Sequence, residues 1–391
     1  MKKLMDSLGL REVGLLELLL ASTQLLAGYT LFGLPMMLVI WLVMIAVVVF
    51  KGHFKIRLFL PLFVYAIYWS IHETFILCID NNTNVNALIG QVVYFIGFMC
   101  IYSHLDEKKL KGCFNWVAII AIIGLVIQWL QILRGELVHP IELPGFAMPD
   151  NRLEQEIPRP SSFFMEPQAF VSFMVIPLFF SLKDKMYVWM SVIILSIFLT
   201  TSTTGILGVF IMLFASLFVN KKRSWSSVII IILGGVFAFA LFNSSIFELG
   251  VDKLLETDSG TNEHRLEQGM YIVSTMNPLE MVFGVPFSSA YHYCLSGRAP
   301  NVAIYGSGAD AVVYMSSFWY LILRFGIVGL VLYLNVYLSV FRKNKEVLPL
   351  LFFMIAVLFS NPDGTGVNYI VCLLVMLCVA ESSYKVSNVH Q

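Results

Sequence analysis

The segment RPSSFFMEPQ (residues 159–168) runs directly into the apolar stretch AFVSFMVIPLFFSL (residues 169–182). The first part carries an arginine, a glutamate and two prolines, whereas the second has no charged side chain. An apolar stretch of this kind predicts a helix that enters the hydrocarbon core of a bilayer. A charged, rigid segment at the outer end of such a helix suits a substrate with an anionic head at the surface and a tail in the membrane.

The composition extends this prediction to all 391 residues, because 58% of them are hydrophobic and only 13% are charged. The chain is therefore far more apolar than an ordinary globular domain. We expect an all-α, polytopic integral membrane protein with a single transmembrane domain over residues 1–391, whose first span is a signal anchor. The twelve predicted spans are 13–32, 34–50, 58–78, 86–103, 113–133, 168–182, 186–202, 204–219, 227–243, 316–340, 347–361 and 366–381.

Lysine and arginine accumulate in the cytoplasmic loops of membrane proteins, so their positions test the number of spans. With the N-terminus inside, every even-numbered span ends in a basic segment. The cations on this inner side are Lys2, Lys3, Arg11, Lys51, Lys55, Arg57, Lys108, Lys109, Lys111, Lys183, Lys185, Lys221, Lys222, Arg223, Arg342, Lys343, Lys345 and Lys385. A missed or invented span would break this alternation of basic and non-basic loops, so the pattern supports twelve spans. An even number of spans places both termini on the same side, and we expect both in the cytoplasm.

The cations that remain on the outer side are mostly arginines: Arg134, Arg152, Arg159, Lys253, Arg265, Arg298 and Arg324. A planar guanidinium group binds phosphate or carboxylate through two parallel hydrogen bonds, which the lysine ammonium does not. The set is therefore consistent with recognition of an anionic substrate. The alternative is that these side chains snorkel to the interface and pair with nearby acids.

Two long segments, 134–167 and 242–315, are predicted to lie on the outer side. Loops of this length are usually functional or disordered. The first is rich in proline, which favours an extended, stiff lid. The second contains a helical stretch, 263–276, which we expect to lie flat on the membrane. Its apolar positions at helical spacing are Leu266, Met270, Val273 and Met276.

Several chemistries lack their sequence signals. The chain has no GxxxxGK[ST] loop for nucleotide phosphates and no HExxH motif. Its six cysteines lie mostly within predicted spans and form no cluster with histidine at metal-ligand spacing. We therefore expect no metal ion, no other cofactor and no disulfide framework. A net charge of zero without a basic stripe also gives no support for nucleic-acid binding.

Three segments resemble the O-antigen polymerase and ligase superfamily. RPSSFFMEPQAFVSFMVIPLFF (residues 159–180) is similar to an R-P-x-S-x-F-x-E-P segment that leads into a span. HRLEQGMYIVSTMNPLEMVFGVP (residues 264–286) is similar to an arginine-led helix that ends in a phenylalanine-glycine turn. SFWYLILRFGIVGLVLYL (residues 317–334) is similar to a region that ends in G-x-x-G, here at Gly326 and Gly329.

Members of this superfamily are membrane glycosyltransferases that act on polyprenyl-diphosphate-linked saccharides at the outer face of the bacterial cytoplasmic membrane. The resemblance implies a GT-C-like helical fold in which two outer elements cover a lateral opening for the polyprenyl tail. Ligases of the superfamily carry a histidine and a polar residue just upstream of G-x-x-G, where this chain has Met315 and Ser316. The resemblance therefore points to a repeat-unit polymerase for O-antigen, capsule or exopolysaccharide, with a ligase as the alternative. A flippase and a chain-length regulator are the implied partners.

In such a polymerase, a hydroxyl of one lipid-linked unit attacks the anomeric carbon of another chain, and a polyprenyl diphosphate departs. Arginines held near the outer interface stabilise that departing charge. Each resembling segment carries one candidate: Arg159, Arg265 and Arg324. The alternative for Arg159 and Arg265 is an ordinary solvated ion pair with a neighbouring glutamate. Arg324 lies inside an apolar run, where an ionisable residue is costly and indicates function.

Glu166 is the candidate base for the attacking hydroxyl, or else it orients Arg159. Its place before Pro167 also suits an ordinary helix N-terminus. The residues expected to contact the substrate are Pro160, Ser162, Glu73, His264, His292, Asp310 and Trp319. For Glu73 the alternative is snorkelling to the interface, for Trp319 it is anchoring of the tenth span, and for the loop residues it is simple solvation.

Two other classes of function remain open. A lipid-linked oligosaccharide flippase or another secondary transporter would show inverted repeats and polar groups near the middle of the membrane, often on broken helices. The ionisable residues of this chain are concentrated toward the outer face instead. A non-catalytic scaffold would leave the two arginine-bearing outer segments unexplained.

Overall fold

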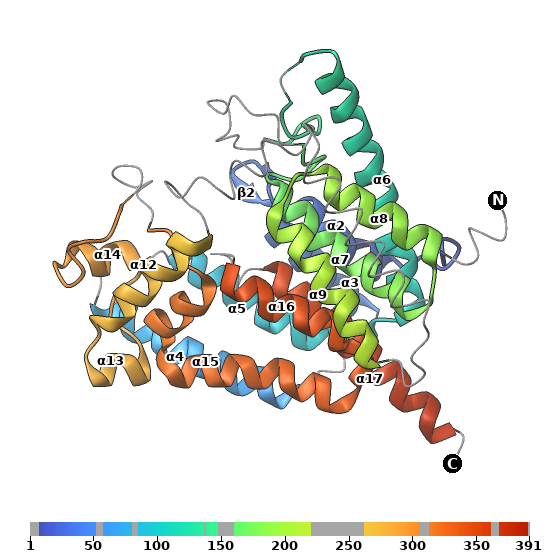
Figure 1. Ribbon diagram of the computed structural model, residues 1–391. Helices are drawn as coiled ribbons and strands as arrows, with labels where there is room; N and C mark the ends of the chain where they lie inside the picture. Colours follow the sequence, from blue (N-terminus) through green and yellow to red (C-terminus); the bar gives the residue numbers. More distant parts are fainter. Residues whose placement is uncertain are drawn as a thin grey trace.

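The computed structural model of the chain is mostly helical, as predicted (Figure 1). It describes residues 8–51, 58–79, 85–136, 138–147, 160–219, 262–304, 313–360 and 367–389. Its elements in chain order are α2 (Leu15–Leu25), β1 (Thr30–Leu31), β2 (Leu34–Pro35), α3 (Met36–Phe50), α4 (Leu60–Ile79), α5 (Val85–Ile101), η1 (Tyr102–His104), α6 (Glu107–Leu133), α7 (Pro167–Lys183), α8 (Tyr187–Leu199), α9 (Thr203–Val219), α12 (Asn262–Ser274), α13 (Pro278–Phe283), α14 (Ala290–Leu295), α15 (Ser317–Lys343), η3 (Lys345–Val347), α16 (Leu348–Ser360) and α17 (Val367–Val389).

Among the described residues, three helices are long and apolar enough to cross a membrane: α4, α6 and α15. The other apolar helical stretches, which include Tyr369–Ser382 within α17, are 10–17 residues long and fall below the roughly 20 residues that a hydrocarbon core requires. A helix lies at each predicted span except 227–243, which is outside the described residues. The structure thus supports a helical membrane protein with three candidate spans and many shorter apolar helices.

The first predicted span, 13–32, is wrong in its C-terminal part. Helix α2 ends at Leu25, and β1 and β2 then form a short antiparallel hairpin. Phe32 and Gly33 have φ angles of 51° and 79° at its turn, and this left-handed backbone does not continue a helix. The hairpin is extended by the first predicted outer segment, because Thr30 and Ala147 exchange backbone hydrogen bonds of 2.8 and 3.1 Å.

The helices pack mainly in pairs, of which α4 with α15 and α9 with α16 are two. Figure 1 shows α4 and α15 side by side, with α12, α13 and α14 gathered beyond one end of the pair. These three short helices lie in the described part of the second predicted outer segment, residues 262–304 and 313–315. The fold therefore brings that segment onto the end of two of the candidate spans.

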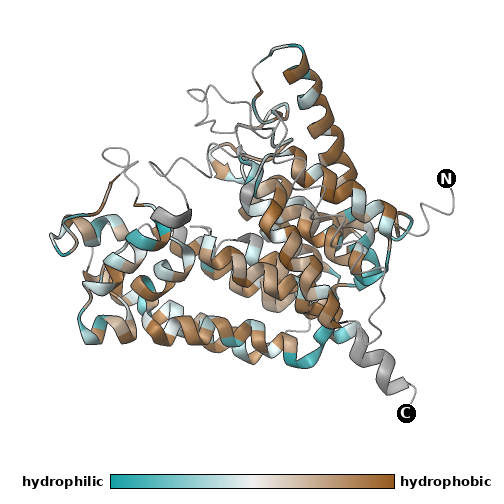
Figure 2. Cartoon of the chain, viewed as in Figure 1, coloured by the Kyte–Doolittle hydropathy of each residue, from teal (hydrophilic) through white to brown (hydrophobic). Residues whose placement is uncertain are grey.

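Helix α6 is hydrophobic along most of its length (Figure 2), and both α4 and α6 expose several large apolar side chains. Only 33% of the most apolar window of each helix is buried inside the protein, against 61% for α15. On α6 the exposed residues include Ile123, Val126, Leu130 and Leu133. Apolar surfaces of this extent indicate contact with lipid or another apolar partner. Helix α15 is correspondingly an inner helix.

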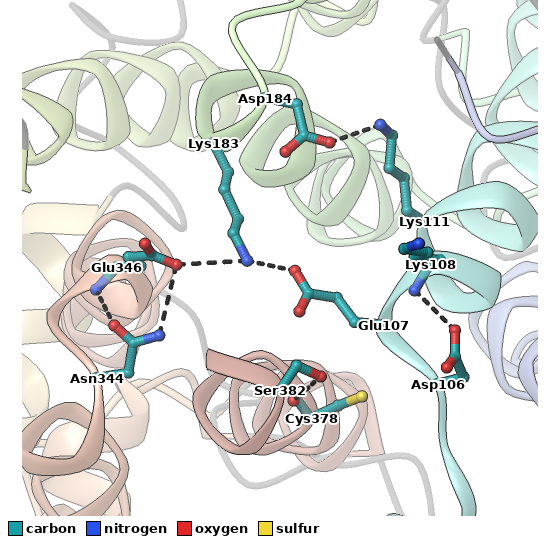
Figure 3. A network of polar contacts seen from close by, with 10 residues as sticks. All are labelled: Asp106, Glu107, Lys108, Lys111, Lys183, Asp184, Asn344, Glu346, Cys378 and Ser382. Carbon is teal, nitrogen blue, oxygen red and sulfur yellow. Dashed lines mark hydrogen bonds and ion pairs between the residues drawn. The ribbon is translucent and has the colours of Figure 1, made fainter. Parts of the chain in front are cut away.

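Several charged residues that are predicted to lie on the same side of the membrane meet in one network (Figure 3). Lys183, at the end of α7, pairs with Glu107 at the start of α6. The same ammonium group lies 3.4 Å from Glu346 in η3. Lys111 and Asp184 form a second pair at 2.5 Å. This proximity is compatible with three loops on one face of a membrane.

Candidate functional site

A buried ion pair joins α4 to α15. The guanidinium group of Arg324 donates from Nε to Glu73 Oε1 at 3.0 Å and from Nη2 to Glu73 Oε2 at 2.6 Å. Both side chains are nearly inaccessible, with 7% and 8% of their surfaces exposed. Two parallel hydrogen bonds fix the planes of both groups and make this the stronger kind of ion pair. The structure thus brings together two residues that lie 251 positions apart in the chain.

Arg324 also connects this pair to the second outer segment. Its Nη1 donates to the backbone carbonyl of Phe287. The next residue, Ser288, lies with its Oγ 2.6 Å from Nδ1 of His292 in α14. The predicted substrate residue His292 is therefore linked through Ser288 to the backbone segment that holds Arg324.

A cavity of about 250 Å³ lies beside the ion pair. Its walls come from α4, α5, α15 and α17, and both Glu73 and Arg324 line it. Five tyrosines contribute to the lining: Tyr65, Tyr320, Tyr333, Tyr337 and Tyr369. The phenolic oxygens of Tyr333 and Tyr337 are 3.1 Å apart. The cavity therefore combines aromatic faces and hydroxyl groups with one charge pair.

Helix α15 is broken two residues after Arg324, which corrects the prediction of a continuous span over 316–340. Gly326 has φ 66° and ψ −175°, far from helical values. A Cβ atom at this position would lie 2.1 Å from the carbonyl oxygen of Val282, so only glycine permits the approach of this chain segment. The break allows α13 to pack directly against the backbone of α15.

A second glycine completes this contact from the other side. Gly284, in the phenylalanine-glycine turn after α13, has φ 92°, and a Cβ there would lie 2.2 Å from the carbonyl oxygen of Arg324. Val285 N donates to Leu323 O at 2.9 Å, and the hydroxyl of Tyr68 donates to Phe325 O at 2.7 Å. Two backbone carbonyls next to the break, those of Leu323 and Phe325, thus accept hydrogen bonds from outside α15. Two of the three resembling segments, 264–286 and 317–334, meet here.

Arg265 lies on α12, which packs against α15 and α16. Its guanidinium carbon is 5.4 Å from the centre of the Tyr314 ring, and Nη1 donates to Ser360 O at 3.4 Å. The helical stretch predicted at 263–276 is confirmed as α12, whereas its predicted apolar face is only partly right. Met270 is 56% exposed, and the fully buried position is Ile272.

The buried face of α12 differs from the predicted one because of how α12 packs against α15. Gly269 lies against the side chain of Trp319, and a Cβ there would be 2.6 Å from the indole. The smallest residue of α12 therefore admits the largest side chain of α15, and Met270 beside it points outward. Trp319 packs between helices in this arrangement and contacts Phe318 edge to face at 4.9 Å.

Arg298, one of the outer arginines, contacts the segment whose Phe287 carbonyl binds Arg324. Its guanidinium group bonds to Glu280 in α13, which raises the pKa of Arg298. The guanidinium carbon also lies 5.7 Å from the centre of the Phe287 ring and 5.8 Å from that of Tyr293. These contacts connect α13 to α14 across the residues that border the cavity.

The end of the first outer segment is anchored by a residue that sequence reasoning missed. The buried Gln128 of α6 accepts hydrogen bonds from the backbone N–H groups of Ser161 and Ser162, at 2.9 and 2.6 Å. Its amide nitrogen donates to His139 O at 2.7 Å and to Ser162 O at 3.2 Å. The sequence signal that could have indicated this role is the polar amide of Gln128 inside the apolar run of a predicted span.

The remaining predicted site residues are distributed as follows. Pro160 and Ser162 are buried, and the Ser162 hydroxyl donates to Ala121 O at 2.7 Å. Glu166 is exposed at the N-terminus of α7, where its side chain makes no capping hydrogen bond. His264 lies on α12, and its side chain is outside the described part. Arg159 and Asp310 lie outside the described residues.

The part of the chain that the structure describes contains no group of three or more His, Cys, Asp or Glu side chains that is arranged to hold a metal ion. Comparison with models of known protein families found no match, and no curated protein is significantly similar to this chain.

Proposed function

We propose that this protein is a membrane glycosyltransferase that polymerises polyprenyl-diphosphate-linked oligosaccharide units at the outer face of the bacterial cytoplasmic membrane. The proposal includes twelve spans in a GT-C-like arrangement, with both termini in the cytoplasm. It rests on the three resembling segments, on the distribution of lysine and arginine, and on the geometry around Arg324.

The single observation that carries the proposal is the position of Arg324. It is a buried guanidinium group at the wall of a cavity, and it lies next to the contact between two of the resembling segments. A group in this position is preorganised and partly dehydrated, which strengthens its attraction to a charge that develops during the reaction. The negative charge that develops on the departing polyprenyl diphosphate is of this kind. Arg265, on the neighbouring helix α12, and Arg159, next to the buried Pro160, are the other proposed contributors.

The test is the glycan length profile of a strain that lacks this protein. The strain is complemented with the wild type, Arg159→Ala, Arg324→Ala or Arg134→Ala at matched membrane levels. Arg134 is an exposed arginine at the end of α6 and serves as the control. We expect long polymer with the wild type and with Arg134→Ala, and only single repeat units on the final acceptor with the other two variants. Unchanged polymer in the deletion strain would refute the proposal.

One observation favours a second candidate, a transporter of lipid-linked oligosaccharides. Secondary transporters often place their binding site at discontinuous helices, and α15 is discontinuous at Gly326 beside the cavity. The two candidates differ in the location of unpolymerised units. Loss of a polymerase leaves single units on the outer surface, whereas loss of a flippase leaves lipid-linked units facing the cytoplasm.

A further inference from the structure

Glu73 is the one carboxylate among the described residues that line the cavity. It projects from α4, and both of its oxygens accept hydrogen bonds from Arg324. Two carboxylate oxygens together offer about four lone-pair sites, so these two bonds leave acceptor capacity unused. Its orientation is fixed by the bidentate geometry before any ligand enters.

The cavity has a volume and a lining chemistry that suit a sugar residue. Its wall follows α4 from Leu62 to Glu73, a rise of roughly 16 Å at about 1.5 Å per residue. Its volume, about 250 Å³, is below the range of about 300–1,000 Å³ that is typical of pockets for drug-sized ligands. Tyrosine rings offer flat apolar faces, and the tyrosine hydroxyls and Gln91 offer hydrogen bonds. A single hydroxyl-rich ring satisfies both kinds of surface.

We propose that this cavity holds the terminal sugar of the acceptor unit and that Glu73 accepts the proton of its attacking hydroxyl. This inference rests on the proposed function and assigns to Glu73 the role of base that the sequence suggested for Glu166. The hydroxyl oxygen forms a bond to the anomeric carbon of the donor chain, and its proton moves to a Glu73 oxygen. The bond from that carbon to the diphosphate breaks, and its electron pair leaves with the polyprenyl diphosphate.

The ion pair couples these two events. Before the reaction, the charges of Glu73 and Arg324 balance each other in a buried setting. Proton transfer neutralises the Glu73 carboxylate, so the charge of Arg324 becomes uncompensated at the same time as the departing diphosphate gains one further negative charge. Among the described residues, the contacts to Glu73 and Phe287 use three of the five N–H groups of Arg324. The other two are donors for the phosphate oxygens.

Glu166 has a different setting. It is exposed at the beginning of α7, a helix that packs mainly against α6, α8 and α9. Glu73, by contrast, lies on the helix that packs along α15 and shares a cavity wall with Arg324. A base and the cation that stabilises the leaving group must lie at the same reaction centre, and Glu73 meets this condition.

The test uses the full-length protein in nanodiscs with lipid-linked units extracted from the deletion strain. The variants are Glu73→Gln and the exchange of Glu73→Arg with Arg324→Glu. We expect Glu73→Gln to lower kcat by at least about 100-fold, in line with the loss of a general base, with little change in KM. The exchange restores an ion pair but moves the carboxylate to the other helix, so we expect a folded and inactive protein.

Gln91→Ala is the second, independent variant, because it alters the cavity without touching the ion pair. We expect it to raise the KM for the acceptor several-fold with kcat nearly unchanged, and it decides the cavity assignment even if the Glu73 variants fail to fold. Polymerisation by Glu73→Gln or by the exchange variant at near wild-type rates would overturn the inference while leaving the proposed function intact. An inactive wild type in this assay, together with unchanged polymer in the deletion strain, would instead refute the function itself.

Discussion

The backbone carbonyl of Arg324 occupies the space that a side chain on Gly284 would need, because a Cβ at that glycine would lie 2.2 Å from the carbonyl oxygen. This contact ties the turn after α13 to the helix that carries the buried guanidinium group. The packing therefore depends on the absence of a side chain at one position in the second outer segment.

Replacement of Gly284 or Gly326 by alanine is expected to destabilise the protein strongly, since both positions combine a left-handed backbone with backbone contacts. We expect a loss of roughly 3 kcal/mol or more for each, measured as a fall in the thermal unfolding midpoint of the detergent-solubilised protein. Gly297→Ala is the matched control, because its φ is +80° but a Cβ there meets no heavy atom within 4 Å. It should lose only about 1–2 kcal/mol from backbone strain. Equal losses at all three positions would contradict the close packing.

Replacement of Gln128 by leucine is expected to loosen the attachment of the first outer segment to α6. The change removes the acceptor of two buried backbone N–H groups, those of Ser161 and Ser162, and each costs about 1–3 kcal/mol when left unsatisfied. Limited proteolysis of the 134–167 segment should therefore become faster. Gln131→Leu, at a half-buried position one turn later on the same helix, should leave the cleavage rate unchanged.

Replacement of Lys183 by methionine is expected to cost about 1–3 kcal/mol, between the values for exposed and buried ion pairs. The Lys183 side chain is 20% exposed, and its ammonium group contacts both Glu107 and Glu346, so its loss leaves two carboxylates without their shared cation. The control is Lys345→Met, because that lysine is exposed. A wild-type unfolding midpoint for Lys183→Met would show that the network of Figure 3 adds nothing to stability.

Cysteine labelling tests the assignment of the two membrane faces. In a Cys78→Ser background, which removes the exposed native cysteine, a membrane-impermeant maleimide should label Asn301→Cys in intact cells. It should label Lys345→Cys only after the cells are broken.

Cys294 is an internal control for the labelling, because burial raises the pKa of its thiol to about 11, and the reactive thiolate is therefore scarce at pH 8. Its labelling should stay negligible at pH 8. Labelling of Lys345→Cys in intact cells would reverse the topology.

The helical segments could be predicted from the sequence because uninterrupted apolar runs leave the backbone few alternatives in an apolar environment. The exceptions arise from local backbone chemistry. The first predicted span failed after Leu25, where α2 ends and the chain enters a hairpin that turns at Phe32 and Gly33. The break in α15 was missed because Gly326 also reads as a small packing residue, and only the approach of Val282 reveals its role.

The site was partly predictable for a related reason. Glu73 and Arg324 each stood out as ionisable residues within apolar runs, which signals a cost that some partner must offset. Their pairing could not be predicted, because it depends on how α4 and α15 pack, and a single sequence contains no direct record of contacts between distant segments. For the same reason, the hydrogen bonds from Ser161 and Ser162 to Gln128 could not be predicted from the sequence.

The interruption of α15 at Gly326 gives the cavity two walls that belong to different rigid pieces. Tyr320 and Arg324 lie on the piece before the glycine, whereas Tyr333 and Tyr337 lie on the piece after it. The angle that the backbone takes at this one residue therefore sets the distance between the two ends of the cavity.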